Sequence, residues 1–162
     1  MNIIEIFTKS LFLIISFDSD LWEIIILSLY VSLFALLVAS VFGLLIGYYL
    51  ALRNFFFKNF ILIILNSLMG IPPVVVGLIV YFIFASGGPF GILQLLYTPT
   101  AMIIAQVIII FPIVTSISHE IFDQNWRVYK DQLRSINMPF FGVAFIITKH
   151  SYFLVITALL SA

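Results

Sequence analysis

Few residues of this 162-residue chain have the type and spacing that chemistry requires. His119, Glu120 and Asp123 lie within one helical turn, a spacing that could hold a metal ion, but they lack a fourth ligand, and we interpret them as the solvated edge of a loop. Cysteine is absent, which excludes disulfides and thiolate metal sites. The sequence has no phosphate-binding glycine loop, dinucleotide fingerprint or nucleophile elbow. It therefore predicts no catalytic residue, no metal site and no cofactor.

The most specific motif is a double proline inside an uncharged stretch, in the sequence MGIPPVVVG at residues 69–77. A helix interior is destabilised by about 3 kcal/mol or more for each proline, because the ring removes an N–H donor and clashes with an earlier carbonyl. The motif therefore predicts a kinked or unwound helix, and carbonyls freed at membrane depth must face protein or a watery cavity. A translocation path is one interpretation and a purely structural kink is the other. The candidate path residues are Asn66, Ser67, Gly70, Pro72, Pro73 and Gly77.

A pair of glycines four residues apart, Gly43 and Gly47, is typical of helices that approach a neighbour closely in a membrane. The alternative is that glycine is merely frequent in membrane helices. Only helix packing is predicted from this pair.

The composition indicates what kind of element must position these residues. Hydrophobic residues make up 64% of the chain and charged residues only 9%, with a mean hydropathy of +1.26. A soluble domain carries roughly 25% charged residues, so a soluble globular domain, a nucleic-acid binder and a disordered tail are all excluded. The chain is predicted to be an integral protein of a lipid bilayer.

The charge-free stretches predict the membrane spans. There are 29 uncharged residues over 24–52 and 61 over 59–119, and the second stretch divides at the glycine- and proline-rich residues 85–99. About 20 helical residues cross a hydrocarbon core, and uniformly apolar runs favour helices over a barrel. We therefore expect an all-α, polytopic transmembrane bundle within one domain. Its parts are an interfacial amphipathic helix over 1–17, spans over 21–52, 57–84 and 98–118, a cytoplasmic loop over 119–150, and the start of a further span over 151–162.

The charged connections predict the orientation. Arg53 and Lys58 flank the first connection, and four further basic residues follow the third span, whereas acidic residues precede the first span. Basic residues stay on the cytoplasmic side, so the N-terminus is predicted to lie outside. In the cytoplasmic loop we expect a short helix over 128–137, closed by Asn137 and followed by Pro139, that could dock into a soluble partner.

The chain resembles the permease subunits of ATP-binding-cassette importers of the molybdate/tungstate type. The resemblance rests on three places. The first is DLWEI at 20–24 leading into LSL at 27–29, and the second is MGIPPVVVGL at 69–78 followed by SGGP at 86–89 and TPTAMIIAQ at 98–106. A third place is the loop motif of these permeases, E-A-A, three residues, glycine, nine residues, isoleucine. Its spacing is kept here with different side chains at Asp131, Gln132, Leu133, Asn137 and Ile147.

The resemblance implies a type I importer permease fold in a bacterial or archaeal cytoplasmic membrane. It implies an ATPase subunit that the coupling residues contact, an extracytoplasmic oxyanion-binding protein and a second permease copy, with ATP hydrolysis in the partner. Family members continue past residue 162, so a chain covering the first two thirds of a permease is expected. The alternative is a membrane scaffold or assembly subunit without transport.

Overall fold

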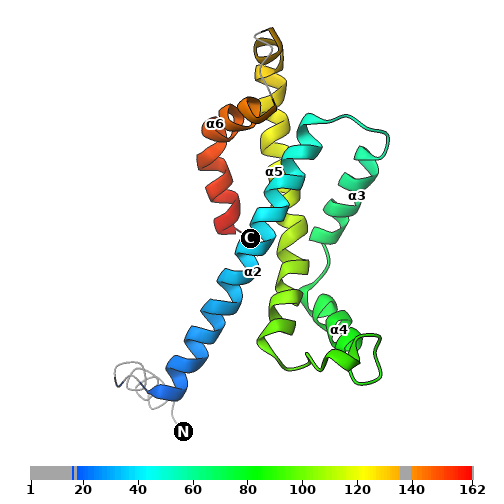
Figure 1. Ribbon diagram of the computed structural model, residues 1–162, viewed down its shortest axis with the longest axis vertical. Coiled ribbons are helices and arrows are strands. Elements are labelled where there is room, and N and C mark those ends of the chain that lie inside the picture. Colours follow the sequence, from blue (N-terminus) through cyan, green and yellow to red (C-terminus); the bar gives the residue numbers. More distant parts are fainter. Residues whose placement is uncertain (1–15, 17, 136–139, 162) are drawn as a thin grey trace.

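The computed structural model describes residues 16, 18–135 and 140–161, and the regular structure in this part of the chain is helical, as predicted (Figure 1). Two of the helices, α2 and α5, are long and apolar enough to cross a membrane, and the bent pair α3 and α4 gives a third if it counts as one span. The interfacial helix predicted over 1–17 lies outside the described residues apart from Ser16.

Helix α2 (Ser19–Leu52) begins at Asp18, whose carboxylate accepts a hydrogen bond from the Leu21 N–H at 3.2 Å. Six of its eight buried residues recur at every fourth position, and most of the six are small: Val31, Ala35, Ala39, Gly43, Gly47 and Ala51. The side that they form packs along α5 in the most extensive contact between helices of the described chain. Small side chains let the two backbones approach closely, which favours association where lipid supplies no hydrophobic driving force.

The span predicted over 57–84 is two helices, α3 (Lys58–Met69) and α4 (Pro73–Phe84), bent by 99° relative to one another. Pro73 occupies the first turn of α4, where its missing N–H costs nothing, and Pro72 precedes it with an extended backbone (φ −59°, ψ 136°). Each helix has 12 residues and rises about 18 Å, less than a hydrocarbon core of about 30 Å. The helix is therefore broken at the double proline, as the motif predicted, and whether the pair crosses the membrane as one span over 57–84 stays a prediction.

The helix that contains the third predicted span continues past Ser118. Helix α5 (Pro99–Ser135) is continuous over 37 residues and includes Pro112, so the predicted loop over 119–150 and the separate short helix over 128–137 are wrong for the described residues. No glycine or proline occurs over 113–135, and Asp123 pairs with Arg127 one turn later, which supports helix beyond the apolar segment. The charge at Glu120 thus indicates a change of solvent and not the end of a helix.

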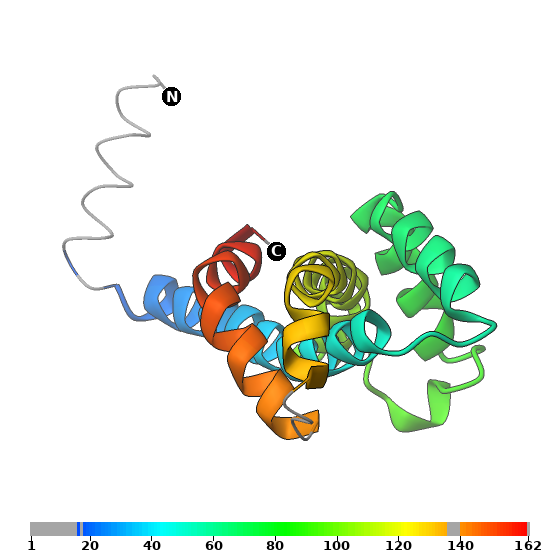
Figure 2. The same cartoon turned by 90° about the horizontal axis from the view of Figure 1, so that it is seen from above.

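Helix α6 (Phe140–Ser161) begins eleven residues before Ser151, where the sequence analysis placed the start of a span. Residues 140–148 are uncharged and helix-compatible, and the sequence places Pro139 directly before them, where proline is compatible with a helix start. Figures 1 and 2 show α6 turning back beside α5 and α2. Val155 of α6 packs there with Tyr48 of α2 and Phe122 of α5, whose rings meet edge to face at 5.5 Å.

The two ends of the bundle differ in charge. The start of α2 and the connection between α4 and α5 lie at one end, and the end of α2 and the start of α3 lie toward the other (Figure 1). Lys58 at the start of α3 reaches Asp123 of α5, so the two basic segments of the sequence share one end of the molecule. A shared end is what the predicted orientation requires.

Candidate functional site

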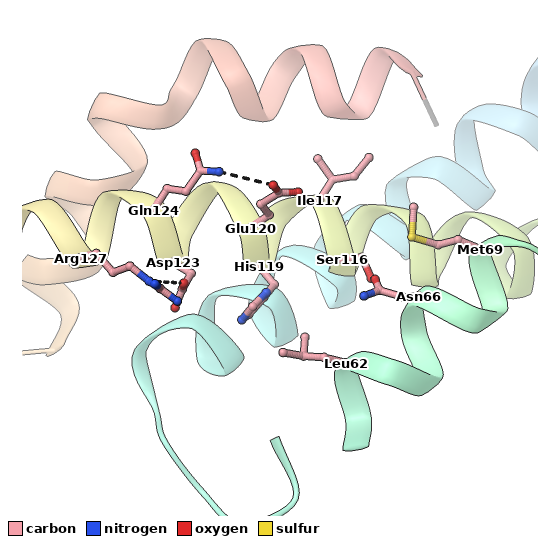
Figure 3. Close-up of a pocket in the computed structure, with 10 residues that line it drawn as sticks. All are labelled: Leu62, Asn66, Met69, Ser116, Ile117, His119, Glu120, Asp123, Gln124 and Arg127. Atoms are coloured by element: carbon pink, nitrogen blue, oxygen red, sulfur yellow. Dashed lines mark hydrogen bonds and ion pairs between the residues drawn. The ribbon is translucent and has the colours of Figure 1, made fainter. Parts of the chain in front are cut away.

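A pocket of about 470 Å³ lies between α3 and residues 116–127 of α5 (Figure 3). Helix α3 contributes three side chains one turn apart, and α5 contributes the polar side chains that face them. The lining residues are Leu62, Asn66, Met69, Ser116, Ile117, His119, Glu120, Asp123, Gln124 and Arg127. The pocket thus reaches from the residue before the helix break to the charged part of α5.

One hydrogen bond joins the two helices at the pocket. The Ser116 hydroxyl donates to the Asn66 side-chain oxygen at 2.9 Å, and Figure 3 shows the two side chains pointing toward one another. Ser116 is 9% exposed, so its hydroxyl needs a partner inside the bundle. Ser67, by contrast, donates to the Ile63 carbonyl of its own helix at 2.8 Å and is exposed.

Three charged side chains, Lys58, Asp123 and Arg127, form what we call the charged trio. The Lys58 ammonium lies 3.7 Å from one Asp123 oxygen, and the Arg127 Nε donates to the other at 2.7 Å. The side chains of Lys58 and Asp123 are only 13% and 19% exposed, whereas that of Arg127 is 76% exposed. Asp123 thus uses both oxygens, and one carboxylate faces two cations.

A second pocket of about 510 Å³ shares Asp123 and Arg127 with the first. Its other lining residues are Ala51, Asn54, Trp126 and Lys130. Lys130 is partly buried and forms no ion pair with any residue that the structure describes. The two pockets therefore meet at Asp123 and Arg127 of the charged trio.

His119 has a buried Nε2 without a hydrogen-bond partner in the described chain. His119, Glu120 and Asp123 do not form a group that could hold a metal ion, and a search of the described residues finds no such group elsewhere. They are helical and line a pocket, so their interpretation as a solvated loop edge is wrong. The chemistry that this lining supports is hydrogen bonding and charge pairing.

The glycine pair lies in the α2–α5 contact. A Cβ on Gly43 would meet the Val114 side chain at 2.9 Å, and a Cβ on Gly47 would meet the Thr115 carbonyl oxygen at 2.8 Å. Real Cβ contacts essentially never come this close. The approach of the two backbones at Gly47 therefore requires the absence of a side chain.

The candidate path residues gather at the break between α3 and α4. Asn66 and Ser67 lie on α3, Gly70 and Pro72 lie in the break, and Pro73 begins α4. Gly77 lies one turn further along α4, and no atom within 4 Å of it would meet an added Cβ.

The candidate coupling residues lie at the far end of α5. Asp131 and Gln132 are exposed in its last turn, and Leu133 belongs to the same turn. Ile147 lies in α6, and Asn137 lies outside the described residues. Neither pocket beside the charged trio is lined by Asp131 or Gln132.

Two features were not predicted from the sequence: the polar face of α5 that lines the pocket, and the ion pair between Lys58 and Asp123. Ser116, His119, Asp123 and Arg127 recur at intervals of three or four, the spacing of one helix face. That periodicity crosses Ser118, where the span was predicted to end. Because the helix was predicted to end at Ser118, this periodicity was not recognised.

Comparisons with known proteins identify the family. Residues 39–162 match the family described as binding-protein-dependent transport system inner membrane component. The tungstate uptake system permease protein TupB of Peptoclostridium acidaminophilum is 40% identical over 119 residues, which are 74% of this chain and 52% of that protein.

Two further relatives are 32% identical. A probable anion ABC transporter permease protein of Haloferax volcanii matches over 83% of this chain and 58% of its own length. The tungstate uptake permease of Campylobacter jejuni matches over 68% of this chain and 46% of its own length. This chain thus spans about half the length of the curated relatives it matches. With apolar helices and a family match over most of its length, the chain belongs to the inner membrane components of binding-protein-dependent transport systems, a family of multi-pass permeases.

Proposed function

We propose that the chain forms the membrane-spanning part of an ATP-driven importer for an oxyanion, with tungstate or molybdate as the substrate. The observation that carries the proposal is the 40% identity over 119 residues to a tungstate uptake permease. The chain serves as a path and brings no catalytic group. ATP hydrolysis belongs to a partner subunit.

The path in this proposal runs beside the break between α3 and α4. The break interrupts backbone hydrogen bonding in an uncharged stretch of 61 residues, where unpaired carbonyl and amide groups require protein or water. A dianion passing there meets hydroxyl and amide donors because no cationic side chain lies over 59–118. The Asn66 amide supplies such a donor, and the Ser67 hydroxyl supplies another when it leaves the Ile63 carbonyl. Gly70, Pro72, Pro73 and Gly77 shape the backbone that holds them.

Coupling to the ATPase is assigned to the inner end of α5 and the start of α6. Asp131 and Gln132 are exposed there, at the end of a helix that also lines the pocket beside the break. Leu133, Asn137 and Ile147 complete the expected motif. Closure of the ATPase pair would favour one of two permease arrangements through this end, because a ligand shifts an equilibrium only by binding its states differently. A second permease copy and an external binding protein complete the importer.

An uptake assay tests the proposal. This chain, alone and joined to the part of the Peptoclostridium relative beyond the matched region, is expressed with that system's ATPase and binding protein in a strain without tungstate uptake. Tungstate accumulation that depends on ATP, together with recovery of the ATPase on the tagged chain, is the expected result. Membrane insertion of both forms without uptake and without the ATPase would contradict the proposal.

A further inference from the structure

We infer that the charged trio and Lys130 form an oxyanion-binding site around Asp123 and Arg127, where the two pockets meet. The ligand class is a tetrahedral dianion or a phosphate group. It would bind to Lys58, Arg127 and Lys130 and replace the Asp123 carboxylate in its ion pairs. The inference deepens the proposed function and rests on it for the identity of the transported anion.

The balance of charge at this position is the first argument. Asp123 neutralises at most one of its two cationic neighbours, and Lys130 adds a third cation in the second pocket, which Asp123 and Arg127 also line. Lys130 is partly buried, where an unpaired charge is less well solvated than on an open surface. An anion at this position would supply the missing negative charge.

The donor chemistry is the second argument. The Arg127 guanidinium carries five N–H donors in a planar fork, and its Nε donates to Asp123. A guanidinium suits two-point binding of a tetrahedral oxyanion, while Lys58 and Lys130 act as point charges. Asn54 adds an amide to the lining of the second pocket. The combination is selective for an anion with several oxygen atoms.

The position of the trio relative to the break is the third argument. One pocket is lined both by Asn66 and Met69, next to the break, and by Asp123 and Arg127. Glu120 also lines it, which disfavours an anion at that point, but Glu120 is exposed and accepts a hydrogen bond from Gln124 at 3.4 Å. The cationic end therefore binds the anion after it has passed the uncharged stretch.

Asp123 makes the site reversible. With no anion present, the Asp123 carboxylate pairs with Lys58 and Arg127. An incoming dianion carries two negative charges and displaces the carboxylate from these two side chains. When the anion leaves, the ion pairs of Asp123 re-form and compete against rebinding. Asp123 in this account weakens equilibrium binding and speeds release.

Fluorescence of Trp126 measures binding directly. The chain has two tryptophans, so Trp22→Phe leaves Trp126, which lines the second pocket, as the single reporter. The full chain carrying Trp22→Phe is placed in nanodiscs of neutral phosphatidylcholine and titrated with sodium tungstate at constant ionic strength. We expect a saturable change in Trp126 emission.

Three variants in this background decide the assignment. Arg127→Gln is expected to weaken tungstate binding at least about tenfold, the loss typical of a charge-assisted hydrogen bond. Asp123→Asn is expected to tighten it by about tenfold. Lys149→Gln removes one exposed positive charge from α6 and serves as the matched control, with unchanged binding. Equal binding in Arg127→Gln and Lys149→Gln, or weaker binding in Asp123→Asn, would overturn the inference.

Lipid composition separates the two sources of the ligand. Replacing a fifth of the lipid with phosphatidylglycerol leaves the tungstate response unchanged if the site takes a free oxyanion, and shifts the titration to higher tungstate if a lipid phosphate competes. Either result keeps an anion site, whereas no saturable response in either lipid overturns it. Circular dichroism checks the helical content of each variant, and Lys58→Gln and Lys130→Gln replace Arg127→Gln if that variant loses helix.

The uptake assay keeps this inference apart from the proposed function. If the parent sequence accumulates tungstate and Arg127→Gln accumulates it with unchanged KM and rate, the inference fails while the function stands. If the parent accumulates none, the function fails.

Discussion

Gly47 shows how a single missing side chain sets the distance between two helices. An added Cβ would meet three atoms of α5 at 2.8–3.0 Å, two of them backbone atoms of Thr115 and His119. At Gly43 the closest atom, at 2.9 Å, belongs to the Val114 side chain. A side chain can rotate away more readily than a backbone, so the two glycines differ in tolerance.

Substituting each glycine by alanine tests this difference. Gly47→Ala is expected to destabilise the chain by about 2–3 kcal/mol through overpacking, and Gly43→Ala by about 1–2 kcal/mol. Gly77→Ala is the control: its Cβ enters open space, and alanine favours helix by about 1 kcal/mol over glycine. The midpoint of thermal unfolding in nanodiscs ranks the three variants, and a Gly47→Ala midpoint at or above that of Gly77→Ala would contradict this packing.

The hydrogen bond between Ser116 and Asn66 can be tested in the same way. Ser116→Ala removes the hydrogen bond to Asn66 and is expected to cost about 0.6 kcal/mol, the average for side-chain hydrogen bonds between membrane helices. Ser67→Ala is the matched control, because Ser67 bonds only within its own helix. The same unfolding measurement should show a loss for Ser116→Ala that exceeds the loss for Ser67→Ala.

At the scale of elements, the right angle between α3 and α4 depends on two prolines. Pro72→Ala with Pro73→Ala restores two N–H donors and removes two steric clashes, so a continuous helix over 58–84 becomes accessible. Spin labels at the exposed positions Asn59 and Phe82 are expected to move apart by about 10 Å, given a rise of 1.5 Å per residue. Pulsed dipolar spectroscopy measures the distance, and the absence of native cysteine makes both labels unique.

Transport provides the functional side of the same test. If the break faces the path, the double variant lowers tungstate uptake while membrane insertion and ATPase recovery persist. A straightened helix with unchanged uptake would leave the break as a packing device only.

The break could be predicted from sequence because proline acts locally, through a donor and a ring that it always carries. The continuation of α5 beyond Ser118 was not predicted, because the charged residues from Glu120 onward were interpreted as the end of the helix. Whether a charged segment remains helical depends on its neighbours, and here Asp123 pairs along the helix with Arg127 and across it with Lys58. The Lys58–Asp123 pair forms only because α3 packs beside α5, and no local pattern in the sequence predicts that packing.

At the scale of the whole molecule, the placement of Lys58 against Asp123 puts both basic segments at one end of the bundle, and we expect that end to lie on one side of the membrane. Single cysteines at Ser86 and Ser135, both exposed, should therefore react with an impermeant maleimide from opposite sides. The Ser86 variant is expected to label in intact cells and the Ser135 variant only after the membrane is opened. Labelling of both from the same side would contradict the topology.

Helix α5 also has a mechanical consequence. Its 37 residues extend about 55 Å, and each of the other α-helices described contacts it directly. A tilt of about 5° about its midpoint would displace each end by roughly 2.4 Å on that length. Pro112 removes one backbone hydrogen bond at about a third of the length, so stiffness is lowest there. A displacement at Ser135 is therefore transmitted to the Asn66–Ser116 hydrogen bond through continuous helix. It reaches α4 only through the helix segment that Pro112 weakens.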